Sequence, residues 1–362
     1  MEEDVTTRDP MLQRQQLEEQ RRKVDFDTYD VTVDELVRRV ERLRIEIAPI
    51  YQRQFRWDPV RQSRLIESLL LGIPVPPLFM ATNLVPGQQI QWEVVDGLQR
   101  LLTLVNFVGD EKSRQAARLK DEPLVLKDLE KLLALNGMAF LELPNDIRTA
   151  LEDRPVKVIV LNDKSDIQVR FDLFERLNTG GVKLTDQEVR ECVFRGPFMD
   201  LLTELARQPD FRAVVRLPKA SWMDGTPEDY VLRFFAFLEQ YETFNHSVKD
   251  FLNHFTEQAA KVPMSDQRRK IFLDTFSYLA TVFPDGIKSR KGMTPVNLFE
   301  GVSVGAALAR RQNPNLVQPE VAPWLNSDEL RRLTTGATNS RPRVKGRIEF
   351  CRDRFLGVSK DV

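Results

Sequence analysis

Apolar and polar positions divide the chain into a first part of mixed pattern and a second part of helical pattern. Up to about residue 196, short apolar runs typical of strands alternate with segments in which apolar residues recur every three or four positions. Beyond it, the helical spacing continues almost to the end. Strands are expected at residues 45–50, 78–81, 90–95, 139–143 and 155–161. Helices of the second part are expected at residues 229–241, 247–260, 266–283, 295–311 and 343–356.

Local sequence signals mark where several helices begin and end. Residues 32–35 and 185–188 both have the sequence of a capping box, in which a Thr precedes a Glu by three positions. Asp58 followed by Pro59 is typical of an N-cap and a first helical residue. Gly72 is expected to end the helix that starts there.

These patterns predict an α+β fold with three segments. Residues 1–24 are highly polar and are expected to form a disordered arm or a frayed helix. Residues 25–196 are expected to form a mixed domain with a small sheet, and residues 197–362 an all-α helical bundle. A length of 362 residues agrees with two domains of ordinary size.

Residues 93–100 join a short apolar strand to a helix through Asp96 and Gly97. Glycine permits a tight exit from the strand and lets a ligand approach the backbone. The helix expected at residues 98–108 offers free N–H groups and the positive end of its dipole, and Arg100 adds a planar fork of donors. The segment is therefore a candidate phosphate site. An ordinary turn with a solvated arginine explains the same residues and stays open as the alternative.

Histidine and cysteine are scarce. The two histidines, His246 and His254, are too few for most nuclease, hydrolase and transition-metal sites that depend on this residue. Cys192 and Cys351 are far apart in the sequence, so neither a disulfide framework nor a zinc site is expected. No run approaches the roughly 18 to 20 apolar residues of a membrane span, and the N-terminus lacks the apolar core of a signal peptide. A cytoplasmic protein without a membrane partner is expected.

The net charge of −1 conceals a basic C-terminal quarter. Residues 263–362 hold 17 Lys or Arg and 10 Asp or Glu. Such a surplus agrees with a contact to DNA, and a solvated helix surface accounts for it equally well.

Four separated motifs resemble the N-terminal domain of the GmrSD restriction endonucleases, a family also found in stand-alone bacterial proteins and in phage defence. Their order and approximate spacing agree with the family, and the likeness extends over about residues 30 to 240. The motifs are Tyr51-Gln52-Arg53 followed by Trp57, residues 72–77, residues 95–100, and residues 174–181 with Leu184 and Glu188.

The resemblance implies that residues 25–196 form a ParB/sulfiredoxin-like nucleotide-binding domain. Arg100 and the backbone of residues 97–99, Gly97 included, would then hold the phosphates of a nucleoside triphosphate. Asp96 would bind a Mg²⁺ ion or position water, and Gln99 would orient the nucleophile or contact a phosphate oxygen. The family's usual signature is Asp-Gly-Gln-Gln-Arg, the DGQQR motif. Leu98 replaces its first Gln here, which makes binding a firmer expectation than hydrolysis.

Residues 51–57 alternate aromatic and basic side chains. Tyr51 or Trp57 would stack on a base of the nucleotide or of DNA, and Arg53 would add positive charge. The alternative is that the aromatic rings pack in the core and the arginine pairs with an acidic residue.

Asn178 and Thr179 precede two glycines at the end of a predicted helix. By itself this sequence is the ordinary way to end a helix. The resemblance implies that the two residues also line the nucleotide pocket.

In two-part relatives a C-terminal His-Asn-His domain cuts DNA, and residues 242–362 lack the histidine arrangement that it needs. We therefore expect a component of a phage-defence or restriction-type system that binds, and hydrolyses, a nucleoside triphosphate with Mg²⁺, while a protein partner supplies any nuclease. A homo-oligomer is also open. The alternatives are a DNA-binding sensor, which would use residues 51–57 and the basic C-terminal quarter, and a regulatory scaffold for a neighbouring toxin or nuclease.

Overall fold

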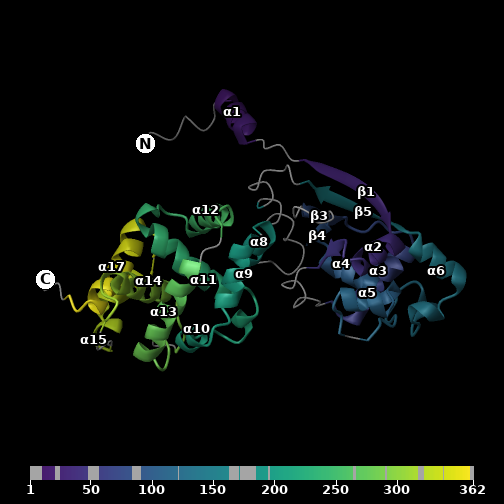
Figure 1. The fold of residues 1–362 in the computed structure, drawn as a ribbon. Coiled ribbons are helices and arrows are strands. Elements are labelled where there is room, and N and C mark those ends of the chain that lie inside the picture. Colours follow the sequence, from purple (N-terminus) through teal and green to yellow (C-terminus); the bar gives the residue numbers. More distant parts are fainter. Residues whose placement is uncertain are drawn as a thin grey trace. The chain divides into compact units, whose positions relative to one another are not determined.

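The structure is a computed structural model. It describes residues 10–20, 25–47, 57–83, 91–120, 122–162, 171, 185–194, 196–263, 266–289, 292–316, 322–336 and 338–358. The chain forms two compact units, Met1–Lys183 (unit 1) and Leu184–Val362 (unit 2), whose elements are labelled in Figure 1.

Unit 1 contains a five-stranded mixed sheet with the strand order β1-β5-β3-β4-β2. Its strands are β1 (Phe26–Thr32), β2 (Ile45–Glu46), β3 (Leu78–Asn83), β4 (Gln91–Asp96) and β5 (Pro155–Leu161). The pairs β1/β5 and β3/β4 are antiparallel, whereas β3/β5 and β2/β4 are parallel. The predicted α+β class is confirmed, and four of the expected strand positions carry these strands.

The edge strand β1 was not among the expected strands. Its sequence, Phe-Asp-Thr-Tyr-Asp-Val-Thr, is mostly polar, and its first five residues are exposed. β5 alone pairs with it in the described sheet. An edge strand with so little buried surface leaves a weak apolar signal, which explains why the pattern did not reveal it.

The helices between β1 and β5 in the sequence lie below these two strands in the view of Figure 1. The described helices of unit 1 are α1 (Pro10–Gln20), α2 (Val33–Glu41), α3 (Pro59–Leu70), α4 (Leu98–Val108), α5 (Glu111–Ala116) and α6 (Asn145–Glu152). α4 contributes the largest apolar face, because Leu101, Leu104 and Val105 are fully buried. The spacing of these residues is what predicted the helix.

The predicted helix ends of α2 and α3 are confirmed, whereas only the Thr32 half of the capping box predicted at residues 32–35 is formed in the described structure, because the Glu35 carboxylate accepts from Arg39. The Thr32 hydroxyl accepts the N–H of Glu35 at 3.3 Å, and the Asp58 carboxylate accepts the N–H of Arg61 at 2.8 Å. Each bond satisfies a backbone donor that the first helical turn leaves without an intrahelical acceptor. Gly72 then follows α3 with a φ of +73°, the left-handed conformation typical of a glycine after a helix.

The strand expected at residues 139–143 is wrong. Phe140–Glu142 forms a short 3-10 helix, and Ala139 makes only an isolated bridge with Val125. The Glu142 carboxylate accepts the N–H of Ala139 at 2.7 Å, which favours the turn over an extended strand. Pro144 then leads directly into α6.

Glu67 of α3 anchors an irregular segment of unit 1. Its buried carboxylate accepts the backbone N–H groups of Glu130, Lys131 and Leu132 at 2.7 to 3.2 Å. Burial alone would raise the pKa of Glu67, but these three donors outweigh it and lower the pKa. One side chain thus fixes a segment that has little secondary structure of its own.

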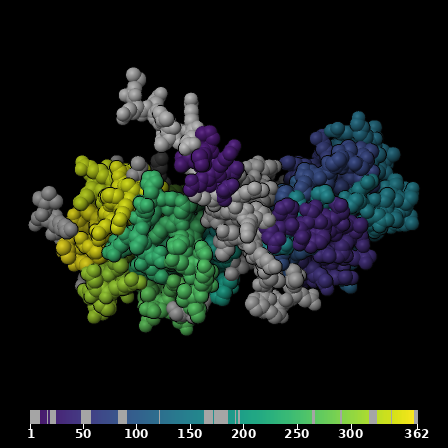
Figure 2. All heavy atoms as spheres, turned by 90° about the horizontal axis from the view of Figure 1, so that it is seen from above, coloured from purple at the N-terminus to yellow at the C-terminus, as the bar shows by residue number. Residues whose placement is uncertain are grey.

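Unit 2 is a helical bundle, drawn in green to yellow in Figure 2. Its described helices are α8 (Asp186–Val193), α9 (Pro197–Leu205), α10 (Pro209–Val214), α11 (Thr226–Gln240), α12 (Val248–Ala260), α13 (Asp266–Val282), α14 (Val296–Gln312), α15 (Ala322–Leu325), α16 (Asp328–Thr334) and α17 (Arg341–Phe355). Five helices predicted for this part coincide with α11 to α14 and α17. None of the helices in the described ranges is long and apolar enough to cross a membrane.

Phenylalanine rings form the centre of unit 2. The fully buried rings that meet there are Phe211, Phe234, Phe272, Phe276 and Phe299. The cluster joins α10, α11, α13 and α14. Most of the pairs are tilted or edge-to-face, arrangements that add to the stabilisation from area burial.

Helix α8 lies between the predicted domain boundary and the division of the two compact units. The sequence placed the boundary at residue 196, whereas the units divide between Lys183 and Leu184. α8 contacts α11 and α12 of unit 2. At its start, Thr185 and Glu188 form the predicted capping box, with bonds in both directions.

Candidate functional site

The candidate site stands where β4 ends and α4 begins. β4 ends at Asp96, Gly97 turns the chain with a φ of +94°, and α4 starts at Leu98. A Cβ atom on residue 97 would stand only 2.5 Å from Cδ2 of the fully buried Leu78. Glycine is therefore required by both the backbone conformation and the space.

The first turn of α4 points donors out of the helix end. Gly97 supplies no side-chain cap, and its carbonyl accepts the N–H of Leu101 at 2.9 Å. The N–H groups of the first turn have no acceptor within the helix, and the helix dipole makes this end positive. Leu98 is buried, so its side chain packs in the core.

Arg100 is held in a fixed position beside this turn. Its Nη2 donates to the Asp96 carboxylate at 2.9 Å and to the Pro77 carbonyl at 3.1 Å. Its Nε is buried and has no hydrogen-bond partner among the described residues. The Arg100 side chain is 16% exposed and that of Asp96 is 30% exposed. The arginine is thus already oriented, and one of its donors is not used by any residue that the structure describes.

Gln99 is joined to Trp57 by a hydrogen bond that spans 42 positions of the chain. Oε1 of Gln99 accepts the backbone N–H of Trp57 at 3.2 Å. The Trp57 carbonyl in turn accepts Nε2 of Gln62 at 2.8 Å. The Asp96–Arg100 motif and the last residue of the predicted 51–57 loop are therefore neighbours, as the nucleotide-site hypothesis requires.

A buried polar chain continues from Gln62 into the helices. Oε1 of Gln62 accepts Nδ2 of Asn106 at 3.0 Å, and Oδ1 of Asn106 accepts a guanidinium N–H of Arg114. All three side chains are buried. Sequence reasoning missed them, and their only signal was polar residues on otherwise apolar helix faces. Because buried polar groups are costly unless they are paired, this chain fixes the position of Trp57.

The ring of Trp57 is partly exposed and lies under a cation. The Arg61 guanidinium carbon is 4.9 Å from the ring centroid, an ordinary cation–π distance. The other predicted binding residues, Tyr51, Arg53, Asn178 and Thr179, lie outside the described residues. Their roles stay predictions.

A metal site made by this chain alone has no support in the described part of the chain, which contains no group of three or more His, Cys, Asp or Glu suited to a metal. Mg²⁺ bound together with a nucleotide needs only one or two carboxylates, because the phosphates supply further ligands. Asp96 fits this requirement.

Many cations of the basic C-terminal quarter have partners within the chain. Arg268 forms a bidentate pair with Glu239 at 2.8 and 2.9 Å, and Arg269 pairs with Glu204 at 2.7 Å. Arg347 is fully buried. These pairs reduce the positive charge that this region offers to DNA, and the DNA contact stays a prediction.

Comparison with known protein families gives a match that covers the part of the chain containing this site. Residues 33–195 match the model of the GmrSD restriction endonuclease, N-terminal domain. This match includes β2 to β5 and the Asp96–Arg100 motif. The comparisons with curated proteins and with solved structures gave no match. The family has a ParB-like fold and a role related to restriction and phage defence. Residues 33–195 are therefore similar to the N-terminal domain of the GmrSD restriction endonucleases.

Proposed function

We propose that this chain binds and hydrolyses a nucleoside triphosphate at the Asp96–Arg100 motif, as a component of a restriction-type defence system in which a partner cuts DNA. The observation that carries the proposal is the position of Arg100. Its guanidinium is held beside an uncapped helix N-terminus, and its Nε has no partner among the described residues. Arginine and helix N–H groups together form a favourable site for phosphate.

Each residue of the motif has a distinct task in this proposal. The first-turn N–H groups and Arg100 bind phosphate oxygens and stabilise the negative charge that develops during transfer. Gly97 lets the phosphate approach the backbone. Gln99 holds Trp57 beside the turn, and in this proposal its amide also contacts the nucleotide.

Asp96 holds Arg100 through their 2.9 Å ion pair. A phosphate that binds Arg100 competes with Asp96 for the guanidinium and leaves this carboxylate able to hold a metal ion. Bound Mg²⁺ would neutralise phosphate charge and orient the nucleotide.

A binding experiment tests the proposal. Full-length protein is titrated with ATP, GTP and CTP in the presence of Mg²⁺, and affinity is measured by calorimetry. We expect one of them to bind and Arg100→Ala to weaken its binding by about tenfold to a hundredfold, the size of a lost charge-assisted contact. The matched control is Arg38→Ala, which removes another i, i+4 Arg–Asp pair, the exposed one with Asp34 at 2.9 Å.

Two results would contradict nucleotide binding at this motif. One is that no triphosphate binds the wild-type chain. The other is that Arg100→Ala and Arg38→Ala bind it equally well. Phosphate release is then measured on the same samples, and a chain that binds without turnover would retain the binding role and lose the hydrolytic one.

The partner nuclease is the remaining part of the proposal. His246 and His254 are both exposed, and the ring of His254 bonds to Gln258 at 2.8 Å. Purified chain is expected to leave DNA uncut, whereas a complex isolated from its native host is expected to cut it. Cleavage by the chain alone would contradict this division of labour.

A further inference from the structure

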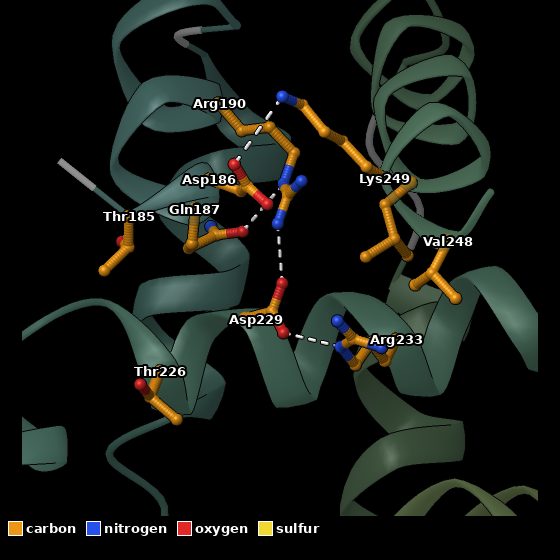
Figure 3. A pocket seen from close by; sticks show the side chains of 10 residues that line it. Thr185, Asp186, Gln187, Arg190, Thr226, Asp229, Arg233, Val248 and Lys249 are labelled. Atoms are coloured by element: carbon orange, nitrogen blue, oxygen red, sulfur yellow. Dashed lines mark hydrogen bonds and ion pairs between the residues drawn. The ribbon is translucent and has the colours of Figure 1, made fainter. Parts of the chain in front are cut away.

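Unit 2 contains a pocket of about 280 Å³ that the Asp96–Arg100 site does not use. Figure 3 shows it between three helices, and its lining comes mainly from their first turns. Asp186 and Gln187 begin α8, Thr226 begins α11, and Val248 and Lys249 begin α12. Three helix N-termini thus meet at one cavity. Each adds positive potential to it, partly offset by acidic residues in the same turns.

Three cationic side chains line the same pocket. They are Arg190, Arg233 and Lys249, and two carboxylates, Asp186 and Asp229, accompany them. In Figure 3 the Arg190 guanidinium points down from α8 toward Asp229, while the Lys249 amine lies near Asp186. The cations exceed the carboxylates by one within this lining.

Arg190 is the most deeply buried of these cations, with a side chain only 1% exposed. Its Nη2 donates to Asp229 at 2.6 Å, its Nε to Gln187 at 3.1 Å and its Nη1 to Asn253 at 3.3 Å. Burial lowers the pKa of Arg190, and the neighbouring Arg233 lowers it further, although Asp229 opposes both effects. Its positive charge is therefore under-compensated in the protein.

Arg233 continues this network of ion pairs: burial alone would lower its pKa, but Asp229 and Glu300 outweigh burial and raise it. Its Nε donates to Asp229 at 2.5 Å and its Nη1 to Glu300 at 2.8 Å, and Glu300 also pairs with buried Arg347. The connected ion pairs contain three guanidinium groups and two carboxylates. The Arg233 guanidinium lies at the pocket in Figure 3. A bound anion would balance the chain of charges.

We propose that this pocket binds a small phosphate-bearing anion, either inorganic phosphate or a small phosphomonoester, between Arg233, Lys249 and the first turns of α8, α11 and α12. Donors approach from three helices, which suits a tetrahedral oxyanion better than a planar carboxylate. The volume lies at the lower limit of the roughly 300 to 1,000 Å³ of ordinary ligand pockets, so the ligand is small. The site is separate from the nucleotide site and does not depend on it.

Lys249 and Asp186 allow a test that leaves the buried ion pairs intact. Their side chains are 36% and 56% exposed, and their charged atoms are 3.8 Å apart. Lys249→Ala removes a ligand charge at the rim, and Asp186→Asn removes a competing negative charge. Lys261→Ala is the matched control, because Lys261 is an exposed lysine that follows the same helix and pairs with Glu257.

The experiment is hydrogen–deuterium exchange of the full chain with phosphate, compared with chloride at equal ionic strength. Phosphate is expected to slow exchange in peptides that cover residues 185–193, 226–233 and 248–252. Titration of this protection gives an affinity that should weaken about tenfold in Lys249→Ala, should tighten severalfold in Asp186→Asn and should not change in Lys261→Ala. Arg100→Ala should leave it unchanged, because that residue belongs to unit 1.

Adenosine monophosphate provides the second arm of the experiment. Protection of the same peptides by this nucleotide at lower concentration than by phosphate would identify a phosphomonoester ligand, and protection by phosphate alone would identify the free ion. The proposal is overturned if neither ligand at tens of millimolar protects these peptides. It is equally overturned if Lys249→Ala and Lys261→Ala have the same affinity.

Discussion

The Gln99 side chain accepts the backbone N–H of Trp57 at 3.2 Å, so that a residue of the phosphate motif holds the end of the aromatic-basic segment. Gln62 holds the carbonyl of the same residue at 2.8 Å. Both the backbone N–H and the backbone carbonyl of Trp57 are therefore hydrogen-bonded to glutamine side chains. The arrangement explains how two motifs that are distant in sequence contribute to one site.

The chain of bonds behind Trp57 predicts the effect of changing Gln62. Gln62→Leu leaves the Trp57 carbonyl and the Asn106 amide without these partners, and we expect a loss of about 2 to 4 kcal/mol in the free energy of unfolding. Urea denaturation measures it. Gln115→Ala, which removes an exposed bond to Glu111, should cost less than about 0.5 kcal/mol. Equal losses in the two variants would show that the buried chain is not important for stability.

Gly97 gives a second prediction through its left-handed backbone and the lack of space around it. Gly97→Ala is expected to destabilise the protein by about 2 to 4 kcal/mol, because the new Cβ meets Leu78 and displaces Arg100. Gly137 has a similar φ of +85°, but a Cβ atom added there would have no neighbour within 4 Å. Gly137→Ala should therefore cost only about 1 to 2 kcal/mol. Thermal unfolding of both variants separates crowding from backbone strain, and identical losses would contradict the crowding.

The sequence predicted those parts of the site that depend on neighbours along the chain. Asp96, Gly97 and Arg100 are close in sequence, and the helix that follows them has a clear apolar spacing, so their strand-turn-helix geometry was accessible. The hydrogen bonds that join Gln62, Asn106 and Arg114 could not be predicted from the sequence, because they depend on how α3, α4 and α5 pack.

The difference between local and distant contacts also explains which secondary-structure predictions were missed or wrong. β1 has a mostly polar sequence and gains its place from pairing with β5, more than a hundred residues later. Residues 139–143 have the apolar content of a strand, but the Glu142 side chain closes a turn onto Ala139. The apolar pattern could not distinguish the turn from a strand, and the bond from Ala139 to Glu142 favours the turn.

Glu67 predicts a dependence of stability on pH. The folded-state pKa of Glu67 is lowered from its ordinary value of 4.5, so its contribution to stability is complete above that value and is lost as the pH falls through the folded-state pKa. Glu67→Gln should therefore cost about 1.5 to 3 kcal/mol at pH 7, and the gap to wild type should narrow below about pH 4.5. Urea denaturation at several pH values measures this gap. Glu130→Gln, which alters an exposed ion pair with Arg64, should show a small gap at every pH. A Glu67→Gln gap independent of pH would contradict the role of its charge.

Glu300 gives the strongest predicted destabilisation, because it is fully buried between Arg233 and Arg347. Glu300→Gln leaves both guanidinium groups under-compensated and should cost about 3 to 5 kcal/mol by urea denaturation. The control is Glu329→Gln, which alters an exposed ion pair with Arg354 at 3.8 Å and should cost less than about 1 kcal/mol.

The double variant Glu300→Leu with Arg347→Met should be more stable than Glu300→Leu alone, because it removes one of the uncompensated charges together with its partner. Additive losses in this cycle would mean that the buried pair contributes no coupling, and the charge balance argued for unit 2 would then be wrong.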